Sequence, residues 1–333
     1  MRVIRSGSVV AGEMVFNMND LTPNRAFIAL MQAARPFLHR AIALSLFVGT
    51  FSPPASASDT IRKIQESKTI VLAFMGTVDN LSPFAMIEPG GDVGGYTIEI
   101  CRKIVQGIRQ ELRMPNLKVQ YFPVNASTRF NALTDNRADL ECSVSTNNTD
   151  RRKKVAFTIP HFFTSVRMLV RADSNIKDWR DLRNKRIVTV KNTSMIDVIN
   201  KRSNIRYLGL AIAELDSDQD CLRMLEQGAA DAFIMDEVLL HGARESTANP
   251  EKLAIRGAPL SIEPYAIMLR KDDPEFKKMV DRQMARLAIS GEIFRLYNRW
   301  FMQPMGPDGR SMNMPMSYIL RDSLRYPTDK ITN

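Results

Sequence analysis

Histidine, cysteine and tryptophan are scarce in this chain, with 3, 3 and 2 copies among 333 residues. The sequence has no Cys-x-x-Cys pair and no cluster of histidines, which argues against a structural metal site. Neither His161 nor His241 has a partnered nucleophile nearby in the sequence, so no catalytic triad can be argued. We therefore expect no metal, no cofactor and no catalytic residues.

The three cysteines, Cys101, Cys142 and Cys221, are an odd number. In an oxidising compartment at least one of them stays free, so a disulfide framework does not organise this fold. The sequence leaves open whether any two of them pair.

Long apolar runs are also missing, and the most conspicuous short one lies near the start. Residues 41–51 are an apolar stretch that follows Arg40 and precedes an Ala-Ser-Ala sequence ending at Ala57. This pattern is typical of a secretory signal peptide and is too short to span a bilayer, although a short buried helix is the alternative. We predict a signal region over 1–57 with cleavage after Ala57. A normal signal would begin at Met31, so residues 1–30 are interpreted as an over-extended start.

The rest of the composition is that of a folded protein of about two domains, with 44% hydrophobic and 25% charged residues. A net charge of +10 is compatible with nucleic acid, an anionic membrane surface or anionic small solutes as partners. The secretory address excludes nucleic acid. No later run approaches the ~20 apolar residues of a membrane helix, and no cysteine directly follows the signal to carry a lipid anchor. We expect a monomer in the periplasm.

Strands and helices alternate along the chain in two sets, which predicts two α/β lobes with mostly parallel sheets. The stretch 75–96 is predicted to be a long surface loop, and nothing regular is assigned to the tail at 303–333. The predicted strands are 69–74, 118–124 and 139–145 in the first set, and 166–172, 186–191, 205–211 and 231–236 in the second.

Cap-type residues follow the strand at 139–145, in the sequence "TNNTDRRKK". Ligands of open α/β sheets bind beyond the carboxyl ends of the strands, where free backbone amides favour anions. We therefore predict that Thr146 and the guanidinium of Arg151 hold a carboxylate, at the start of a helix near residue 150. The next three bases, 152–154, are interpreted as a solvated helix face.

Two further turns lie at equivalent places in the second set. Thr193 and Ser194 follow the strand at 186–191, and Asp236 ends the strand at 231–236. The hydroxyls suit a carboxylate and the acid suits an ammonium group, but each of these residues is also an ordinary helix cap.

Four segments carry a family resemblance: "ECSVSTNNTDRRKKVAFT", "MLEQGAADAFIMDEVLL", "YAIMLRKDDPEFKKMV" and "SGEIFRLYNRWF". Together they resemble the family 3 extracellular solute-binding proteins of amino-acid ABC transporters, and most of all the glutamate/aspartate-binding branch. The likeness runs from about residue 59 to 313 in the same order. It implies a type II periplasmic-binding-protein fold, with two hinge strands and a ligand cleft between lobes at 59–164 plus 267–302 and at 165–266.

The resemblance also implies roles for individual residues. Arg151 would clamp the α-carboxylate of a free amino acid with Thr146, facing Thr193 and Ser194, and Asp236 would hold the α-ammonium group. Arg129 falls on an arginine that the acidic-amino-acid branch directs into the site. The closed protein would deliver its ligand to the permease subunits of an ABC importer.

Three positions depart from the glutamate/aspartate branch. No base follows the first strand, Val144 stands where the branch has serine, and Asp218 stands where it has histidine. A buried side-chain carboxylate needs cationic or hydrogen-bonding partners, so these changes allow a ligand with a neutral polar or even a cationic side chain as well as glutamate or aspartate.

The alternative function is a periplasmic enzyme on the same fold, such as a dehydratase. It would need a general acid or base in the cleft, for which Asp218 and Glu141 are the only candidates.

Overall fold

The computed structural model describes residues 59–76, 82–88, 90–202, 207–304 and 311–330. The predicted signal region lies outside these residues. Residues 57–333 form one compact unit. Within the described residues, no helix is both long and apolar enough to cross a membrane.

The first lobe is built on a five-stranded sheet in the order β4-β1-β5-β13-β6. Strand β1 is parallel to both β4 and β5, whereas β13 is antiparallel to β5 and β6. The helices of this lobe are α2 (Asp59–Ser67), α3 (Tyr96–Glu111), α4 (Arg129–Thr134), α9 (Pro274–Ile289) and α10 (Glu292–Met302). The strands are β1 (Thr69–Phe74), β4 (Lys118–Pro123), β5 (Leu140–Glu141), β6 (Val155–Phe157) and β13 (Met268–Arg270).

The second lobe has a sheet in the order β11-β7-β10-β8-β9. Strands β8, β9 and β10 are parallel, and β7 is antiparallel to β10 and β11. The prediction of mostly parallel sheets is therefore correct for β4, β1 and β5 and for β10, β8 and β9, whereas β13 and β7 enter their sheets in the reverse direction. The elements are β7 (Phe162–Arg171), η3 (Trp179–Leu182), β8 (Arg186–Val190), α5 (Met195–Lys201), β9 (Ala211–Leu215), α7 (Asp218–Glu226), β10 (Ala232–Asp236), α8 (Glu237–Glu245), η4 (Pro250–Lys252) and β11 (Leu253–Arg256).

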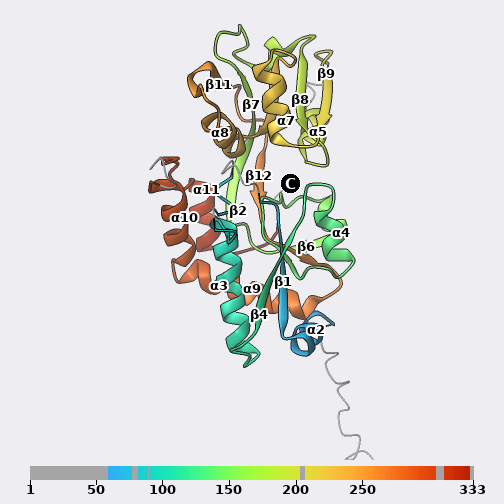
Figure 1. Cartoon of the computed structure of the whole chain (residues 1–333), viewed down its shortest axis with the longest axis vertical. Coiled ribbons are helices and arrows are strands. Elements are labelled where there is room, and N and C mark those ends of the chain that lie inside the picture. Colours follow the sequence, from blue (N-terminus) through green and yellow to red (C-terminus); the bar gives the residue numbers. More distant parts are fainter. Residues whose placement is uncertain (1–58, 77–81, 89, 203–206, 305–310, 331–333) are drawn as a thin grey trace, which may run out of the picture. The chain divides into compact units, whose positions relative to one another are not determined.

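Two strands join the lobes. Strand β12 (Ile262–Tyr265) pairs antiparallel with the first residues of β7, and the pair runs between the two sheets (Figure 1). An aromatic cluster packs at the first-lobe end of this hinge, with ring centroids 4.9 to 5.9 Å apart for Phe84–Phe162, Phe84–Tyr265, Phe162–Phe301 and Phe162–Tyr265. The pair of hinge strands thus rests on the core of the first lobe.

His161 lies immediately before β7 and is completely buried. Its backbone N–H donates to the carbonyl of Tyr265 at 2.9 Å, and its carbonyl accepts from the Tyr96 hydroxyl at 2.7 Å. Burial lowers the pKa of the His161 imidazole to about 3. The residue is a neutral part of the hinge packing.

Four local predictions were wrong. The loop at 75–96 contains a short hairpin, β2 (Met86–Ile87) with β3 (Val93–Gly94), and buries Phe84. The strand expected at 139–145 is only β5, because the chain beyond it leaves the sheet. The helix expected near residue 150 is a single 3-10 turn, η2 (Arg151–Lys153). Of the strand expected at 205–211, residues 203–206 lie outside the described part and 207–210 are not extended; β9 begins at Ala211.

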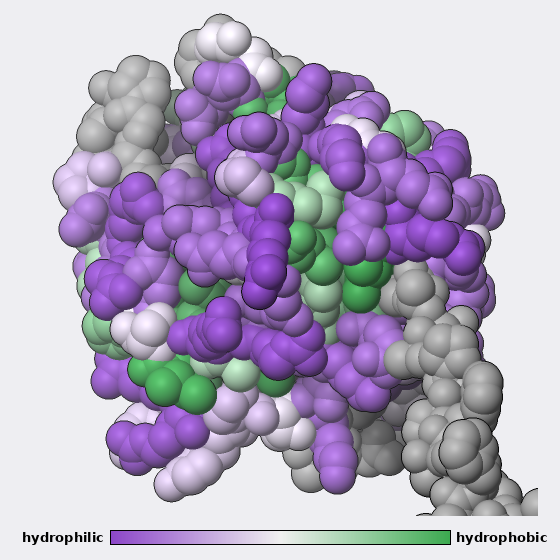
Figure 2. Space-filling model, turned by 90° about the horizontal axis from the view of Figure 1, so that it is seen from below, coloured by the Kyte–Doolittle hydropathy of each residue, from purple (hydrophilic) through white to green (hydrophobic). Residues whose placement is uncertain are grey.

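The tail contains a helix that the sequence reading did not assign, α11 (Tyr318–Arg325). Ser317 caps it by accepting from the backbone N–H of Leu320 at 3.2 Å. Met316, Leu320 and Leu324 recur every four residues and are buried, which gives the helix one apolar face that packs near α9. Seen from below, the first lobe is covered mostly by hydrophilic residues, with smaller hydrophobic areas between them (Figure 2).

Cys101 on α3 and Cys142, just after β5, form a disulfide, and Cys221 is free and buried. The bond closes a loop of 41 residues, whose restriction in the unfolded chain is worth about 4 kcal/mol by the loop-entropy relation.

We expect reduction to lower the free energy of unfolding by about 4 kcal/mol. Urea unfolding with and without dithiothreitol measures this. The double variant Cys101→Ala, Cys142→Ala is the control, because a reductant should leave its stability unchanged. Equal sensitivity of the parent and the double variant would contradict a stabilising role for this bond.

Candidate functional site

A cavity of about 230 Å³ lies between segments of the two lobes. The first lobe contributes the end of β1, residues 124–129 and residues 144–151, and the second contributes residues 190–194, 216–219 and 235–243. The structure brings all eight residues singled out from the sequence to the wall of this one cavity: Arg129, Val144, Thr146, Arg151, Thr193, Ser194, Asp218 and Asp236.

The turn that carries Thr146 and Arg151 is held by its own polar groups. The Asn148 side-chain oxygen accepts from the Arg151 backbone N–H at 2.9 Å, and Arg151 Nη1 donates to the Thr146 carbonyl at 3.1 Å. Thr146 also forms an isolated antiparallel bridge with Tyr265 of the hinge. The guanidinium of Arg151 lies over the Phe130 ring, 5.7 Å from its centroid. The guanidinium of Arg151 is therefore oriented by contacts within the protein.

Burial lowers the pKa of Arg151 to about 9, and repulsion from Arg129 acts in the same direction. The carboxyl groups of Glu263, Asp236 and Glu141 act in the opposite direction and favour the cation. A partly buried cation short of compensation attracts an anion, which fits the expected role of this residue.

Arg129 is only 2% exposed and is the deeper of the two arginines. Its Nη1 donates to the Ser145 hydroxyl at 3.0 Å, while its buried Nε has no hydrogen-bond partner among the described residues. Burial lowers the pKa of Arg129, and the nearby Glu141 carboxyl partly offsets this. One donor of this side chain thus remains for a group in the cavity.

The hydroxyl turn of the second lobe precedes α5. Thr193 donates to the Val190 carbonyl at 2.6 Å, and Ser194 donates to Glu263 Oε2 at 3.2 Å. Both hydroxyl protons are therefore directed at protein oxygens, so a carboxylate here would require the hydroxyls to rotate or would use backbone amides.

Asp236 stands where β10 ends and α8 begins, and its side chain is 4% exposed. Its Oδ2 accepts from the Tyr265 hydroxyl at 2.7 Å, but the side chain makes no cap hydrogen bond to the helix. The other oxygen, Oδ1, is buried without a hydrogen-bond partner in the described part of the chain. The helix-cap alternative for this residue is therefore not supported.

Burial raises the pKa of the Asp236 carboxyl to about 8, and repulsion from Glu263 adds to this. Asp218, the first residue of α7, has a pKa raised to about 6 by burial. Its Oδ1 is also buried and lacks a hydrogen-bond partner in the described residues. Both acids would gain from a cation or a hydrogen-bond donor in the cavity.

Val144 belongs to an apolar wall that the sequence reading did not foresee. The other members are Met75, Val124, Val190, Met235 and Leu239. The sequence did not point to Glu263 either, because no motif surrounds it. Glu263 lies inside the short strand β12, and its contact with Ser194 forms only in the folded chain.

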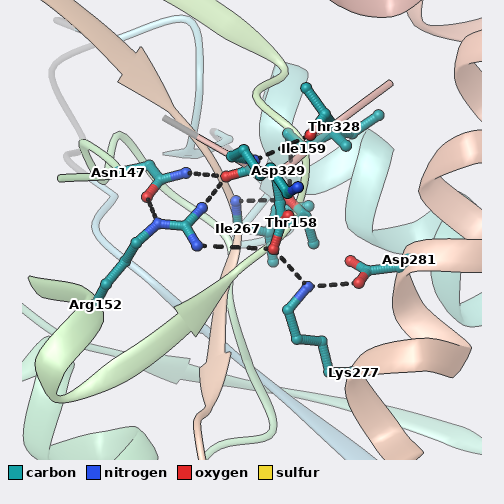
Figure 3. Close-up of polar contacts among 10 residues, drawn as sticks. Asn147, Arg152, Thr158, Ile159, Ile267, Lys277, Asp281, Thr328 and Asp329 are labelled. Carbon is teal, nitrogen blue, oxygen red and sulfur yellow. Dashed lines mark hydrogen bonds and ion pairs between the residues drawn. The ribbon is translucent and has the colours of Figure 1, made fainter. Parts of the chain in front are cut away.

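Arg152 is not the freely solvated base that was predicted, although its neighbours Lys153 and Lys154 are exposed. It is half-buried, and its Nε donates to the side-chain oxygen of Asn147 at 2.7 Å. Figure 3 shows that Asp329 of the tail reaches the same place. The charge run alone could not reveal this contact, because Asp329 lies 177 residues further along the chain.

Two lobes on a strand hinge, with opposite charges facing one cavity, define a solute-binding class of protein. Residues 74–303 match the model of the bacterial extracellular solute-binding proteins, family 3, and the chain belongs to this family.

Relatives support the same assignment. The chain is 35% identical to an L-glutamate/L-aspartate-binding protein of Pseudomonas aeruginosa over 90% of this chain and 98% of the relative. It is 32% identical to the glutamate/aspartate import solute-binding protein of Escherichia coli, over 91% and 99% of the two chains.

Solved structures share the fold. An ancestral arginine-binding protein bound to arginine superposes with a TM-score of 0.62 at 21% identity, over 70% of this chain and 98% of that one. The substrate-binding protein of an amino acid ABC transporter gives a TM-score of 0.60 at 22% identity, over 71% and 100%.

The raised pKa of Asp236 predicts a pH-dependent stability. The folded state keeps this proton up to a pKa of about 8, whereas the unfolded chain loses it near pH 4. The folded state therefore binds more protons between these values, so the contribution of this group to stability falls as the pH rises from 4 to 8.

Asp236→Asn removes this titration. We expect its free energy of unfolding to exceed that of the parent by several kcal/mol at pH 8, and the difference to vanish near pH 4. Urea unfolding of both proteins at several pH values measures it. Parallel pH profiles for the two proteins would show that Asp236 does not titrate in this way.

Proposed function

We propose that this protein binds a free α-amino acid in the cavity between its lobes and delivers it to the permease of an ABC importer. The observation that carries the proposal is the pair Arg151 and Asp236: a cation from one lobe and an acid from the other line the same cavity. An α-amino acid carries the matching anion and cation at a fixed short separation.

Each ligand group has a place in this proposal. The α-carboxylate binds the guanidinium of Arg151 and the hydroxyl of Thr146, opposite Thr193 and Ser194. The α-ammonium group donates to Asp236, whose Oδ1 is the buried acceptor described above. A charge-assisted contact of this kind would favour the ionised form of Asp236 and lower its pKa on binding.

Binding by both lobes implies closure about the hinge. The division that we propose is 59–164 with 267–302 as lobe one, 165–266 as lobe two, and 303–333 as a tail. Away from the hinge, the contacts that join the proposed lobes include a hydrogen bond from Asn192 Nδ2 to the Ser127 hydroxyl at 2.8 Å and an ion pair of Lys201 with Asp150 at 3.7 Å. Both would stabilise the closed form together with the ligand.

The side chain of the ligand would lie near Arg129, Val144 and Asp218. Arg129 offers a donor to a glutamate or aspartate side chain, but Asp218 would repel it, and the apolar wall offers no further donor. An amide side chain can accept from Arg129 and donate to Asp218. A neutral polar amino acid therefore fits these residues better than an acidic one.

The compartment and the partner follow from the relatives. The family is extracellular, and the Escherichia coli relative is named as an import protein. We propose that this chain acts in the periplasm after cleavage at Ala57, as a monomer that docks on permease subunits. The names of these relatives describe binding proteins, which supports a carrier over a dehydratase.

Arg151→Ala tests the clamp. Loss of a charged hydrogen-bonding pair costs about 3 kcal/mol, so we expect the dissociation constant of any bound amino acid to rise roughly a hundredfold. Isothermal titration calorimetry against the common L-amino acids measures it, with the exposed Lys154→Ala as the matched control. Absence of binding to every amino acid by the parent would refute the proposed function, and parent-like binding by Arg151→Ala would refute the clamp.

Asp218→His tests the side-chain preference. We expect the parent to bind L-glutamine about tenfold more tightly than L-glutamate, since an unpaired carboxylate near Asp218 costs at least about 1 kcal/mol. Replacing the acid by histidine should reverse the order, most clearly near pH 6, where histidine is charged. An unchanged ratio of the two dissociation constants in the variant would place Asp218 outside the contact.

A further inference from the structure

The end of the tail lies directly behind the turn that carries Thr146 and Arg151 (Figure 3). The carbonyl of Asp329 accepts a hydrogen bond from Arg152 Nη2 and one from Asn147 Nδ2 at 3.4 Å. Asn147 and Arg152 are the immediate neighbours of the two clamp residues in the sequence. One residue of the tail therefore contacts both ends of the turn.

The Asp329 carboxylate adds charge to these contacts. Its Oδ2 lies 3.7 Å from Arg152 Nη1 and 3.0 Å from Lys277 Nζ, and Lys277 also pairs with Asp281 one helical turn along α9. Asp329 thus stands between two cations, one on the turn and one on α9. This arrangement ties the turn to the helix layer of its lobe.

The turn needs such support because regular structure supplies little. Between β5 and β6 the chain forms only the single 3-10 turn η2, and the Asn147 backbone N–H is held by the Pro264 carbonyl of the hinge at 2.7 Å. The Asn147 side chain also accepts from Arg152 Nε. The Asn147–Arg152 pair is therefore fixed on one side by the hinge and on the other by the tail.

The tail is also held in place by packing of its own helix α11 against the rest of the protein. Helix α11 buries Leu320 and Leu324 only a few residues before Asp329. A short segment, 326–330, then crosses from this helix to the turn. Its reach is fixed by the position of α11.

We infer that Asp329 is a positioning residue for amino-acid binding: through Asn147 and Arg152 it holds the turn in the geometry in which Thr146 and Arg151 meet the ligand carboxylate. The inference rests on the proposed function for the ligand, but the order of the turn can be measured without any ligand.

The experiment compares two shortened forms of the full chain. One ends after Tyr326, which keeps α11 and removes both the carbonyl and the carboxylate of Asp329. The control ends after Lys330 and keeps them. Hydrogen exchange of the ligand-free proteins is followed at the backbone amides of 147–152, and urea unfolding checks that each form is folded.

In the form that ends after Tyr326, we expect amide exchange in the turn to be at least about tenfold faster, as the loss of one hydrogen bond to a charged group predicts. Exchange in the β1 and β8 strands should stay unchanged. The control should match the parent. Faster exchange throughout the lobe would show a general structural role for the tail and would overturn the inference. Exchange in the turn at the rate of the parent would overturn it as well.

Calorimetry with L-glutamine and L-glutamate gives the functional readout. For whichever of them the parent binds, the form that ends after Tyr326 should bind about tenfold more weakly. In an Asn147→Ala, Arg152→Ala background the same shortening should have no further effect, because these two side chains make the contacts of Asp329 with the turn. Additive effects would overturn the inference. If the parent binds neither amino acid, the proposed ligand fails while the exchange result still decides the role of Asp329.

Discussion

The antiparallel pairing of β7 with β12 is the constraint on which the rest of the structure depends. Strands β7 and β12 connect the sheet of the first lobe to the sheet of the second, and Tyr265 at the end of β12 contacts both lobes. Its ring packs in the aromatic cluster of one lobe, its hydroxyl donates to Asp236 of the other, and its backbone bridges Thr146. One residue thus relates the two proposed halves of the ligand site to each other.

The electrostatics of the cavity follow from the same geometry. Asp236 and Glu263 are both nearly excluded from water, and repulsion between them is part of why the Asp236 pKa is raised. An arrangement that lowers the stability of the folded protein at neutral pH is typical of a binding site. A cation bound in the cavity would restore that stability, because it would bind only the folded state. A ligand with both a cation and an anion would therefore compensate the charges that line this cavity.

The sequence predicted the two-lobed α/β class, because strands alternate with helices along the chain. It also singled out cap-type residues after strand ends, and the structure places these residues around one cavity, while their role in binding stays a prediction. It could not predict contacts between distant segments. Glu263 meets Ser194, and Asp329 meets Arg152, only after β12 and α11 are in place. The prediction of a strand at 205–211 was wrong for a different reason. Leu208 is apolar and buried but lies in a loop, and an apolar pattern in the sequence does not distinguish a buried loop from a strand.

The His161 imidazole does not titrate together with the acids of the cavity. The acids with raised pKa values, Asp218 and Asp236, line the cavity, whereas the imidazole that packs beside the hinge strands has a pKa of about 3 and carries no charge across the range in which those acids ionise. Acidification therefore protonates the acids of the cavity while the imidazole beside the hinge stays neutral. Because Asp236 also accepts from the hydroxyl of Tyr265 on β12, its change of charge acts on a hinge strand as well as on the cavity.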